Sequence, residues 1–254
     1  MCCFSPVSPP AGLLAWLRPA RPLRVEETRI FARRDGPRQL LAYQMRLEVG
    51  GEVAMILPLP VAAGHGDDAL RFIDLSDYAR LFEDLARPFL VPQPASRSKG
   101  GPQALAAPLP VVEVGSFEAS FVPSVQDFDR LDPRFRLPTE VWGAVPAVAG
   151  FGFAVFKLKA GARRIHPMAL SFVRPDTERL FFPTLHVHDG TVHATADFDH
   201  VLYWQGDAAA SDQRSATPVG AFVDMTRCAG LVDAAAPVCR RELRGRMPNA
   251  DTWI

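Results

Sequence analysis

The chain has 254 residues, of which 48% are hydrophobic and 22% charged, as in ordinary globular proteins. Lysine and arginine together number 28, and so do aspartate and glutamate. A chain without net charge lacks the positive electrostatic field that attracts nucleic acids and anionic membrane surfaces, so we expect neither as a main partner. No apolar run reaches the roughly 18 residues of a membrane span, and the N-terminal apolar patch is short and interrupted by proline. The sequence therefore predicts a cytoplasmic protein without a membrane span.

The N-terminal third is expected to form strands. Alternating apolar residues predict strands at Thr28–Arg33, Leu40–Val49 and Glu52–Leu57. Asp35-Gly36 and Gly50-Gly51 supply turn residues between them, because glycine tolerates the positive φ that tight turns require. The two-residue Gly-Gly link predicts that the second and third strands pair as a hairpin.

A change of period then indicates a helix. Tyr78, Leu81, Phe82 and Leu85 are spaced as on one face of a helix, and Ser76 is a plausible N-cap. The following segment is poor in large apolar side chains and rich in proline, glycine and serine, as linkers are. We therefore divide the chain into an N-terminal unit at 1–91, a linker or loop at 92–108 and a β-rich unit at 109–254. The two β-rich parts are either two sheets of one domain or two domains.

The C-terminal unit is expected to be mainly strand. The segments "PVVEVGSFEASFV", "GFGFAVFKLK", "MALSFVR", "RLFFPTLHVH" and "TVHATADFDHVLYWQ" all have strand-like patterns, and short helices are expected at 124–131 and 139–145. In "GFGFAVFKLK", Phe151, Phe153 and Val155 alternate with Gly152, Ala154 and Phe156, which is typical of a central strand. The predicted fold class is α+β, with mainly antiparallel sheets and a few short helices.

Four of the six histidines lie in the sequence "LHVHDGTVHATADFDH". Asp189-Gly190 predicts a two-residue hairpin turn that pairs His186 with His193 and places His188 on the same face. Paired residues on one face have Cβ atoms roughly 5 Å apart, so the three imidazoles would converge. Three imidazoles suit a divalent transition metal such as zinc, iron or copper and leave a position for an activated water. The first functional hypothesis is a metal-binding protein or metal-dependent enzyme.

Two histidines other than these three also concern the metal-site hypothesis. His166 becomes a fourth candidate ligand if its strand neighbours the hairpin, whereas alternation along the strand turns His200 to the opposite, apolar face. The alternative interpretation is that this face of the hairpin is simply exposed to water, since antiparallel sheets often leave one polar face in solvent.

The N-terminus carries a second, independent hypothesis. Removal of the initiator methionine would make Cys2 a residue with both a free thiol and a free amine, which is the arrangement of N-terminal nucleophile hydrolases. A thiol-dependent amide hydrolase is therefore the second functional hypothesis, and a non-catalytic structural or interaction domain is the third. The remaining cysteines, Cys3, Cys228 and Cys239, are expected to be buried thiols or soft metal ligands.

The order of several segments resembles that of a family of bacterial proteins of unknown function. The matching segments are "CCFSPV", "IFAR", "MILPLPV", "RPFL", "VVEVGSFEASFV", "FRLP", "FGFAVFKLK" and "IHPMALSF", which together extend over roughly residues 2 to 205. The resemblance implies a β-rich α+β domain and brings no activity or site residue with it. The histidine hairpin is not a feature that we associate with the family.

Overall fold

The computed structural model describes residues 2–6, 24–49, 53–90, 118–130, 150–158, 161–187 and 192–254. The described residues form a β-rich fold, which corrects the predicted α+β class. The α-helix α1 (Leu81–Ala86) is six residues long and continues into a 3-10 turn at Arg87–Phe89. The other helical segments of the described residues are 3-10 turns at Gly66–Ala69, Val125–Arg130 and Val219–Ala221.

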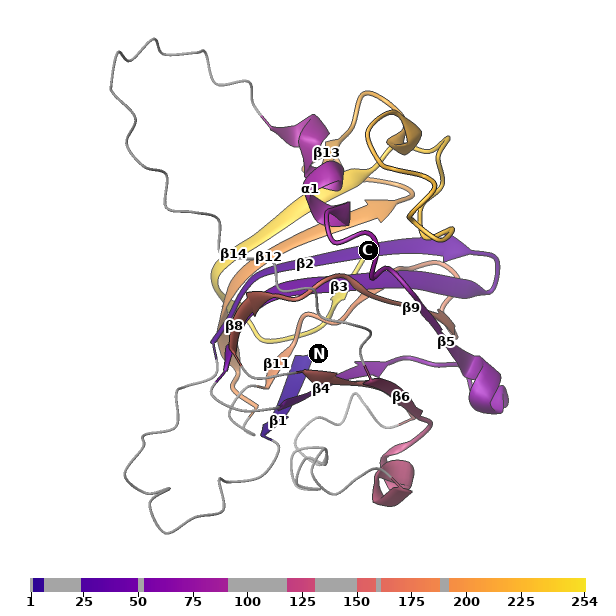
Figure 1. The fold of residues 1–254 in the computed structure, drawn as a ribbon, viewed down its shortest axis with the longest axis vertical. Helices are drawn as coiled ribbons and strands as arrows, with labels where there is room; N and C mark the ends of the chain where they lie inside the picture. Colours follow the sequence, from indigo (N-terminus) through magenta and orange to yellow (C-terminus); the bar gives the residue numbers. More distant parts are fainter. Residues whose placement is uncertain are drawn as a thin grey trace.

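Among the described residues, the larger of two main sheets has eight strands (Figure 1). Its order is β13-β14-β12-β2-β3-β9-β5, and β8 pairs with the end of β3. The strands are β13 (Gln213–Arg214), β14 (Cys239–Pro248), β12 (Thr195–Gln205), β2 (Arg24–Asp35), β3 (Arg38–Val49), β9 (Met168–Val173), β5 (Leu70–Ile73) and β8 (Gly161–Arg164). Neighbours are antiparallel except β12 and β2, which run parallel. Strands from both ends of the chain thus meet at the centre of this sheet.

The second main sheet, as far as the structure describes it, has five strands in the order β11-β1-β4-β7-β6. The strands are β11 (His186–Val187), β1 (Cys2–Pro6), β4 (Val53–Leu59), β7 (Gly152–Leu158) and β6 (Glu118–Val122). A separate two-stranded sheet joins β10 (Phe181–Phe182) to β15 (Thr252–Trp253). The two main sheets lie as facing layers, with the smaller one below the larger one in Figure 1.

The main hydrophobic core fills the space between the two sheets. Alternate residues of the central strands point into it, including Ile30 of β2, Tyr43 of β3, Met55 of β4 and Trp204 of β12. Their neighbours along the same strands point to the outer faces, where a second and a third apolar cluster form. Both faces of the central strands are therefore covered, which is why β4 is buried along its whole length.

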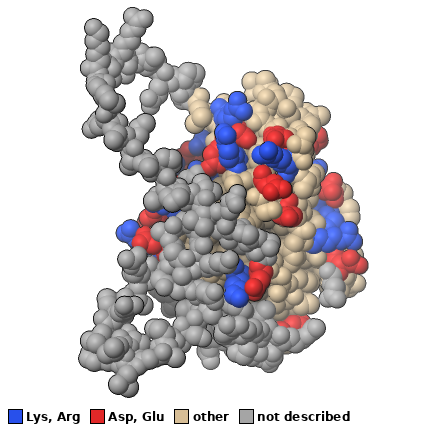
Figure 2. Space-filling view, viewed as in Figure 1, with Lys and Arg blue, Asp and Glu red and all other residues tan. Residues whose placement is uncertain are grey.

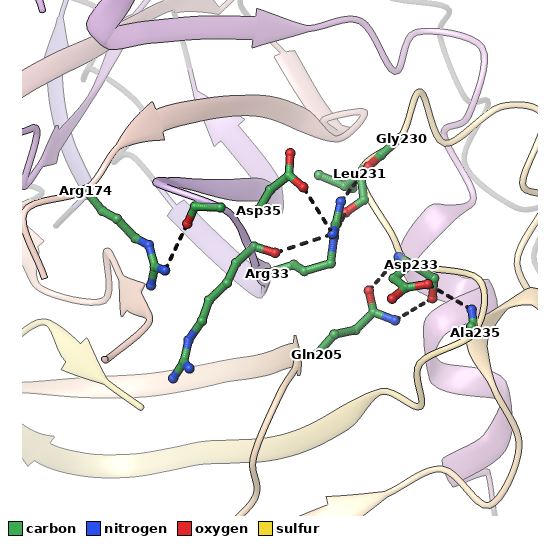
Figure 3. Close-up of polar contacts among 10 residues, drawn as sticks. Arg33, Asp35, Arg174, Gln205, Gly230, Leu231, Asp233 and Ala235 are labelled. Atoms are coloured by element: carbon green, nitrogen blue, oxygen red, sulfur yellow. Dashed lines mark hydrogen bonds and ion pairs between the residues drawn. The ribbon is translucent and has the colours of Figure 1, made fainter. Parts of the chain in front are cut away.

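The outer face of the large sheet is covered by α1 and by the long excursion at 206–238. Arg33 donates to the carbonyls of Leu231 and Gly230 at 3.1 and 3.0 Å, and Gln205 exchanges two hydrogen bonds of 2.8 Å with the backbone of Asp233 (Figure 3). These side-chain bonds satisfy backbone groups that belong to no strand. They fix the excursion against the sheet.

Tyr78 joins α1 to the same excursion. Its hydroxyl donates to Asp84 at 2.9 Å and accepts from the backbone amide of Asp224 at 2.8 Å. Burial raises the pKa of Tyr78, with a further contribution from the Asp84 carboxylate, so the phenol stays neutral. The residue is therefore a buried bridge between two segments that are distant in sequence.

Several predicted elements are confirmed and others are corrected. β2 and β3 form the hairpin predicted at Asp35-Gly36, with Gly36 at φ 55°. β4 pairs with β1 and β7 and belongs to the other sheet, so the hairpin predicted at Gly50-Gly51 is wrong; the link itself lies outside the described residues. β7 is confirmed as a central strand.

The predicted helices are only partly found. The helix expected from Ser76 begins five residues later, at Leu81, because the amide of Ser76 instead bonds to Asp74 in a local turn. Residues 125–130 form a 3-10 turn, and the helix predicted at 139–145 and the segment 92–108 lie outside the described residues.

The described surface carries charges of both signs side by side. Figure 2 shows lysine and arginine next to aspartate and glutamate on the face in view. Among the described residues, no helix has the length and apolar character needed to cross a membrane.

Candidate functional site

The short strand β11 brings His186 next to the N-terminal strand. β1 pairs with β11 in parallel, and the register places the backbone of Cys2 opposite His186 and that of Cys3 opposite Val187. The two segments that sequence analysis treated as independent candidates are therefore neighbours in one sheet.

The ring of His186 contacts His200 across the space between the two sheets. The two Nε2 atoms are 3.1 Å apart, a hydrogen-bond distance, and the ring planes are inclined by 25°. Phe198, two residues before His200 on β12, packs against His186 with ring centroids 4.6 Å apart. One ring nitrogen must donate and the other accept, so the pair holds a single proton between its two Nε2 atoms.

His200 is the buried member of the pair, with 2% of its surface exposed. Burial lowers the pKa of His200 and the Asp199 carboxylate opposes this effect, so the imidazole is neutral at pH 7. The Nδ1 atom of His200 lies 3.6 Å from an Asp199 oxygen, which is longer than a hydrogen bond, and the two groups form an ion pair only when His200 is protonated.

Asp199 is held by an irregularity of β2. Pairing of β2 with β3 shifts register between Glu26 and Arg29, and Glu27 has the left-handed φ of 54°. The amide of Glu27 donates to the carboxylate of Asp199 at 2.6 Å. Burial raises the pKa of Asp199, but the contact with His200 and the amide bonds outweigh it, and the net shift is downward. The carboxylate is therefore ionised beside His200.

Asn249 fixes the backbone on both sides of His186. Its carboxamide oxygen accepts from the amide of His186 at 2.7 Å, and its Nδ2 donates to the carbonyls of His186 and His193 at 3.0 and 2.9 Å. The amide of Leu185 donates to Asp251 at 3.0 Å in the same manner. Residues 249–251 thus stand in for a neighbouring strand and hold His186 toward His200.

The other predicted metal ligands are not found together. His188 lies outside the described residues, His193 is exposed, and His166 lies at the far end of the large sheet beside β9. The pairing expected between His186 and His193 is absent from the strand pairs of the described residues. No group of three His, Cys, Asp or Glu side chains that could hold a metal occurs in the part of the chain that the structure describes.

The two C-terminal cysteines are buried in different places. Cys239 faces the core between the sheets, and Cys228 lies in the cluster on the outer face of the large sheet. Burial raises the pKa of Cys239 and keeps it a thiol. Both residues act as small apolar side chains.

Sequence reasoning missed His200, which it turned away from the other histidines. β11 and β12 belong to facing sheets, so the inward side of one strand meets the inward side of the other. His200 shares its side of β12 with Phe198, Leu202 and Trp204, which are buried. A histidine in an otherwise apolar alternation was the signal that a polar partner would face it from the opposite sheet.

Comparison with known proteins identifies no family for this chain. The chain matches no family model, and it has no match among curated proteins. Two solved structures are similar with a TM-score of 0.44 each: a mutated baculovirus P35 after caspase cleavage, at 11% identity over 90% of this chain and 99% of that one, and the caspase-8/P35 complex, at 10% identity over 90% and 95%.

Proposed function

We propose that this protein is a thiol-dependent hydrolase in which the Cys2 thiol is the nucleophile and the His186–His200 pair is its base. The register that puts Cys2 opposite His186 carries the proposal. A cysteine becomes a strong nucleophile when a nearby imidazole takes its proton. Because an imidazole serves as the base, the proposal does not depend on a free amino group at Cys2.

Each residue has a defined part in the proposed reaction. His186 accepts the thiol proton, and the thiolate attacks the carbonyl carbon of an amide. The carbon–nitrogen bond breaks, and the imidazolium returns the proton to the departing amine. Water then hydrolyses the thioester to give a carboxylic acid and the original thiol. Asp199 stabilises the positive charge that His200 shares with His186, as the carboxylate of a catalytic triad does.

Alkylation by iodoacetamide tests the nucleophile without a known substrate. Mass spectrometry of the intact protein and of its N-terminal peptide would give the rate at Cys2, with Cys3 in the same peptide as the matched control. We expect Cys2 to react about tenfold faster than Cys3 at pH 7, and His186→Gln to abolish the difference. Equal rates at both cysteines in the unaltered protein would overturn the proposal.

A second measurement distinguishes a cysteine that is only acylated from an enzyme that hydrolyses the acyl intermediate and turns over. p-Nitrophenyl acetate would acetylate Cys2 and release one equivalent of p-nitrophenolate, and hydrolysis of the thioester would extend the release beyond one equivalent. Cys2→Ala should remove both phases, and Cys3→Ala should preserve both. A reactive Cys2 that releases only one equivalent would contradict the hydrolase and leave a thiol that is acylated without turnover.

Metal binding at the same imidazole pair is the second candidate. Two nitrogens 3.1 Å apart can both lie about 2 Å from one zinc, iron or copper ion, which favours this candidate. Its ligands would be His186 and His200 in place of the three histidines predicted from sequence. Elemental analysis after expression with the three metals, compared with a His186→Ala, His200→Ala double variant, tests it.

A further inference from the structure

A second feature lies at the opposite edge of the five-stranded sheet from β1 and β11. β6 ends the smaller sheet there and β5 ends the larger one, and a pocket of about 250 Å³ opens between them. Its walls include Phe72 and Asp74 from the β5 segment, Ala119 from β6 and Phe156 from β7. Its walls also include Met168, the first residue of β9, and His166, two residues before it. We call this pocket the sandwich mouth.

The inner part of the sandwich mouth is apolar. Phe156 and Met168 are each 2% exposed and belong to the core between the sheets. Phe72 packs edge-on against Phe156 with ring centroids 5.6 Å apart, yet 39% of its surface is exposed. Pockets for drug-sized ligands measure about 300–1,000 Å³, so this smaller pocket suits a single side chain.

The rim of the sandwich mouth is negatively charged. A hydrogen bond of 2.9 Å from the amide of Ser76 to Asp74 lowers the pKa of that carboxyl, which is ionised and exposed. An apolar interior with one carboxylate at the rim is complementary to a lysine or arginine side chain. The methylene stem would contact the phenylalanine rings, and the cationic end would meet Asp74.

The two strands beside the pocket also offer backbone groups. β5 pairs only with β9 and β6 only with β7 in the described residues, so each strand has one edge without a neighbouring strand there. Exposed strand edges bind extended peptides by adding them to the sheet, while adjacent pockets select their side chains.

We propose that the sandwich mouth binds an extended segment of a partner protein, which adds to the edge of β5 and inserts one lysine or arginine side chain beside Asp74. This site is distinct from the Cys2–His186 site and does not depend on the proposed hydrolase activity. The recognition combines three observations: the apolar pocket, the carboxylate at its rim and the strand edge that runs past it.

Fluorescence anisotropy with the full chain tests the proposal. The probes are blocked, labelled peptides of sequence Thr-Val-X-Val-Thr, in which X is lysine, norleucine or glutamate. An exposed ion pair changes affinity by about two- to fivefold, so we expect lysine to bind that much more tightly than norleucine, and glutamate most weakly. Failure of all three peptides to bind at millimolar concentration would overturn the proposal.

Variants locate the site. Asp74→Asn should remove the preference for lysine over norleucine, and Asp74→Lys should reverse it in favour of glutamate. Asp77→Asn, an exposed aspartate on the following turn, is the matched control and should bind as the unaltered protein does. An unchanged lysine preference in a folded Asp74→Asn protein, checked by thermal unfolding, would contradict the proposal.

Two further arms separate a peptide from a small amine. N-methylation of the two valine amides should weaken the lysine peptide at least tenfold, because it removes donors to the strand edge. Butylamine carries the same cation and stem without a backbone and should compete only weakly. If butylamine competes as well as the lysine peptide, the pocket binds amines and the peptide proposal is wrong.

Discussion

The Nε2 atom of His186 lies 3.1 Å from the Nε2 atom of His200, and the two rings come from strands of different sheets. This hydrogen bond therefore joins the layers of the fold as well as forming part of the candidate site. Protonation of both rings would place two positive charges and two N–H donors opposite each other at that distance, so acid should separate the rings.

The stability of the protein should depend on the protonation of His200. Burial lowers the pKa of His200 in the folded chain below its ordinary value of 6.5, so the unfolded chain binds a proton more readily. The stabilisation is complete above pH 6.5 and decreases as the pH falls below it, by at most about 1.4 kcal/mol per pH unit. Urea unfolding at several pH values would measure this slope. His200→Gln should flatten it, and His193→Gln, an exposed control, should leave it unchanged.

Replacement of Asn249 should destabilise the strand that carries His186. Asn249→Ala removes one acceptor and one donor that together satisfy three backbone groups, at a cost of about 1–3 kcal/mol. The Cδ2 and Cε1 proton resonances of His186 should also shift, because the ring loses its fixed position against Phe198. Asp197→Ala, an exposed residue of β12, is the control for a general loss of stability. Unmoved His186 resonances in Asn249→Ala would show that Asn249 does not position the ring.

The left-handed backbone at Glu27 should make glycine better than alanine at this position. A residue with a Cβ atom costs about 1–2 kcal/mol in the left-handed region, and glycine avoids this cost because it has no Cβ. Both substitutions remove the ion pairs of Glu27 with Arg29 and Arg46, so the difference in stability between them reports the effect of the left-handed backbone alone. Glu27→Gly should unfold at a higher urea concentration than Glu27→Ala, with a difference of about 1 kcal/mol after the flexibility of unfolded glycine is included. Equal stabilities would mean that the bulge relaxes.

Tyr78→Phe should loosen the excursion at 206–238. The substitution leaves the amide of Asp224 without its acceptor, and the loss of such a hydrogen bond costs about 0.5–1.5 kcal/mol. Hydrogen exchange should increase at Asp224 and its neighbours more than in the large sheet. Asp84→Asn keeps an acceptor for the phenol and should cost less. If both variants are equally unstable, the Asp84 carboxylate and not the amide bond is the main contribution.

Local patterns predicted the elements that depend on neighbours in sequence. Asp35-Gly36 specifies a turn between strands that are consecutive, and the alternation in β7 requires no knowledge of its partner. The helix was extended too far because Tyr78 has helical spacing but serves as a buried bridge to Asp224, 146 residues away. Spacing identifies a buried face without identifying what covers it.

The candidate site could not be assembled from the sequence for the same reason. Alternation placed His186 and His200 on opposite faces of a single ribbon, which would be correct if β11 and β12 were paired. The chain instead divides them between facing sheets, so their inward sides meet. The neighbour of His186 in its own sheet is Cys2, at the other end of the chain, and no local pattern encodes that pairing.

The parallel pairing of β2 with β12 has a consequence for how the protein folds. Residue Ile30 lies opposite Leu202, so the centre of the large sheet cannot close until more than two hundred residues have left the ribosome. Until then one edge of β2 has no partner, and exposed strand edges promote association between chains. Folding should therefore be slow, with a lag during synthesis, and chaperones that shield β2 and β3 should raise the yield.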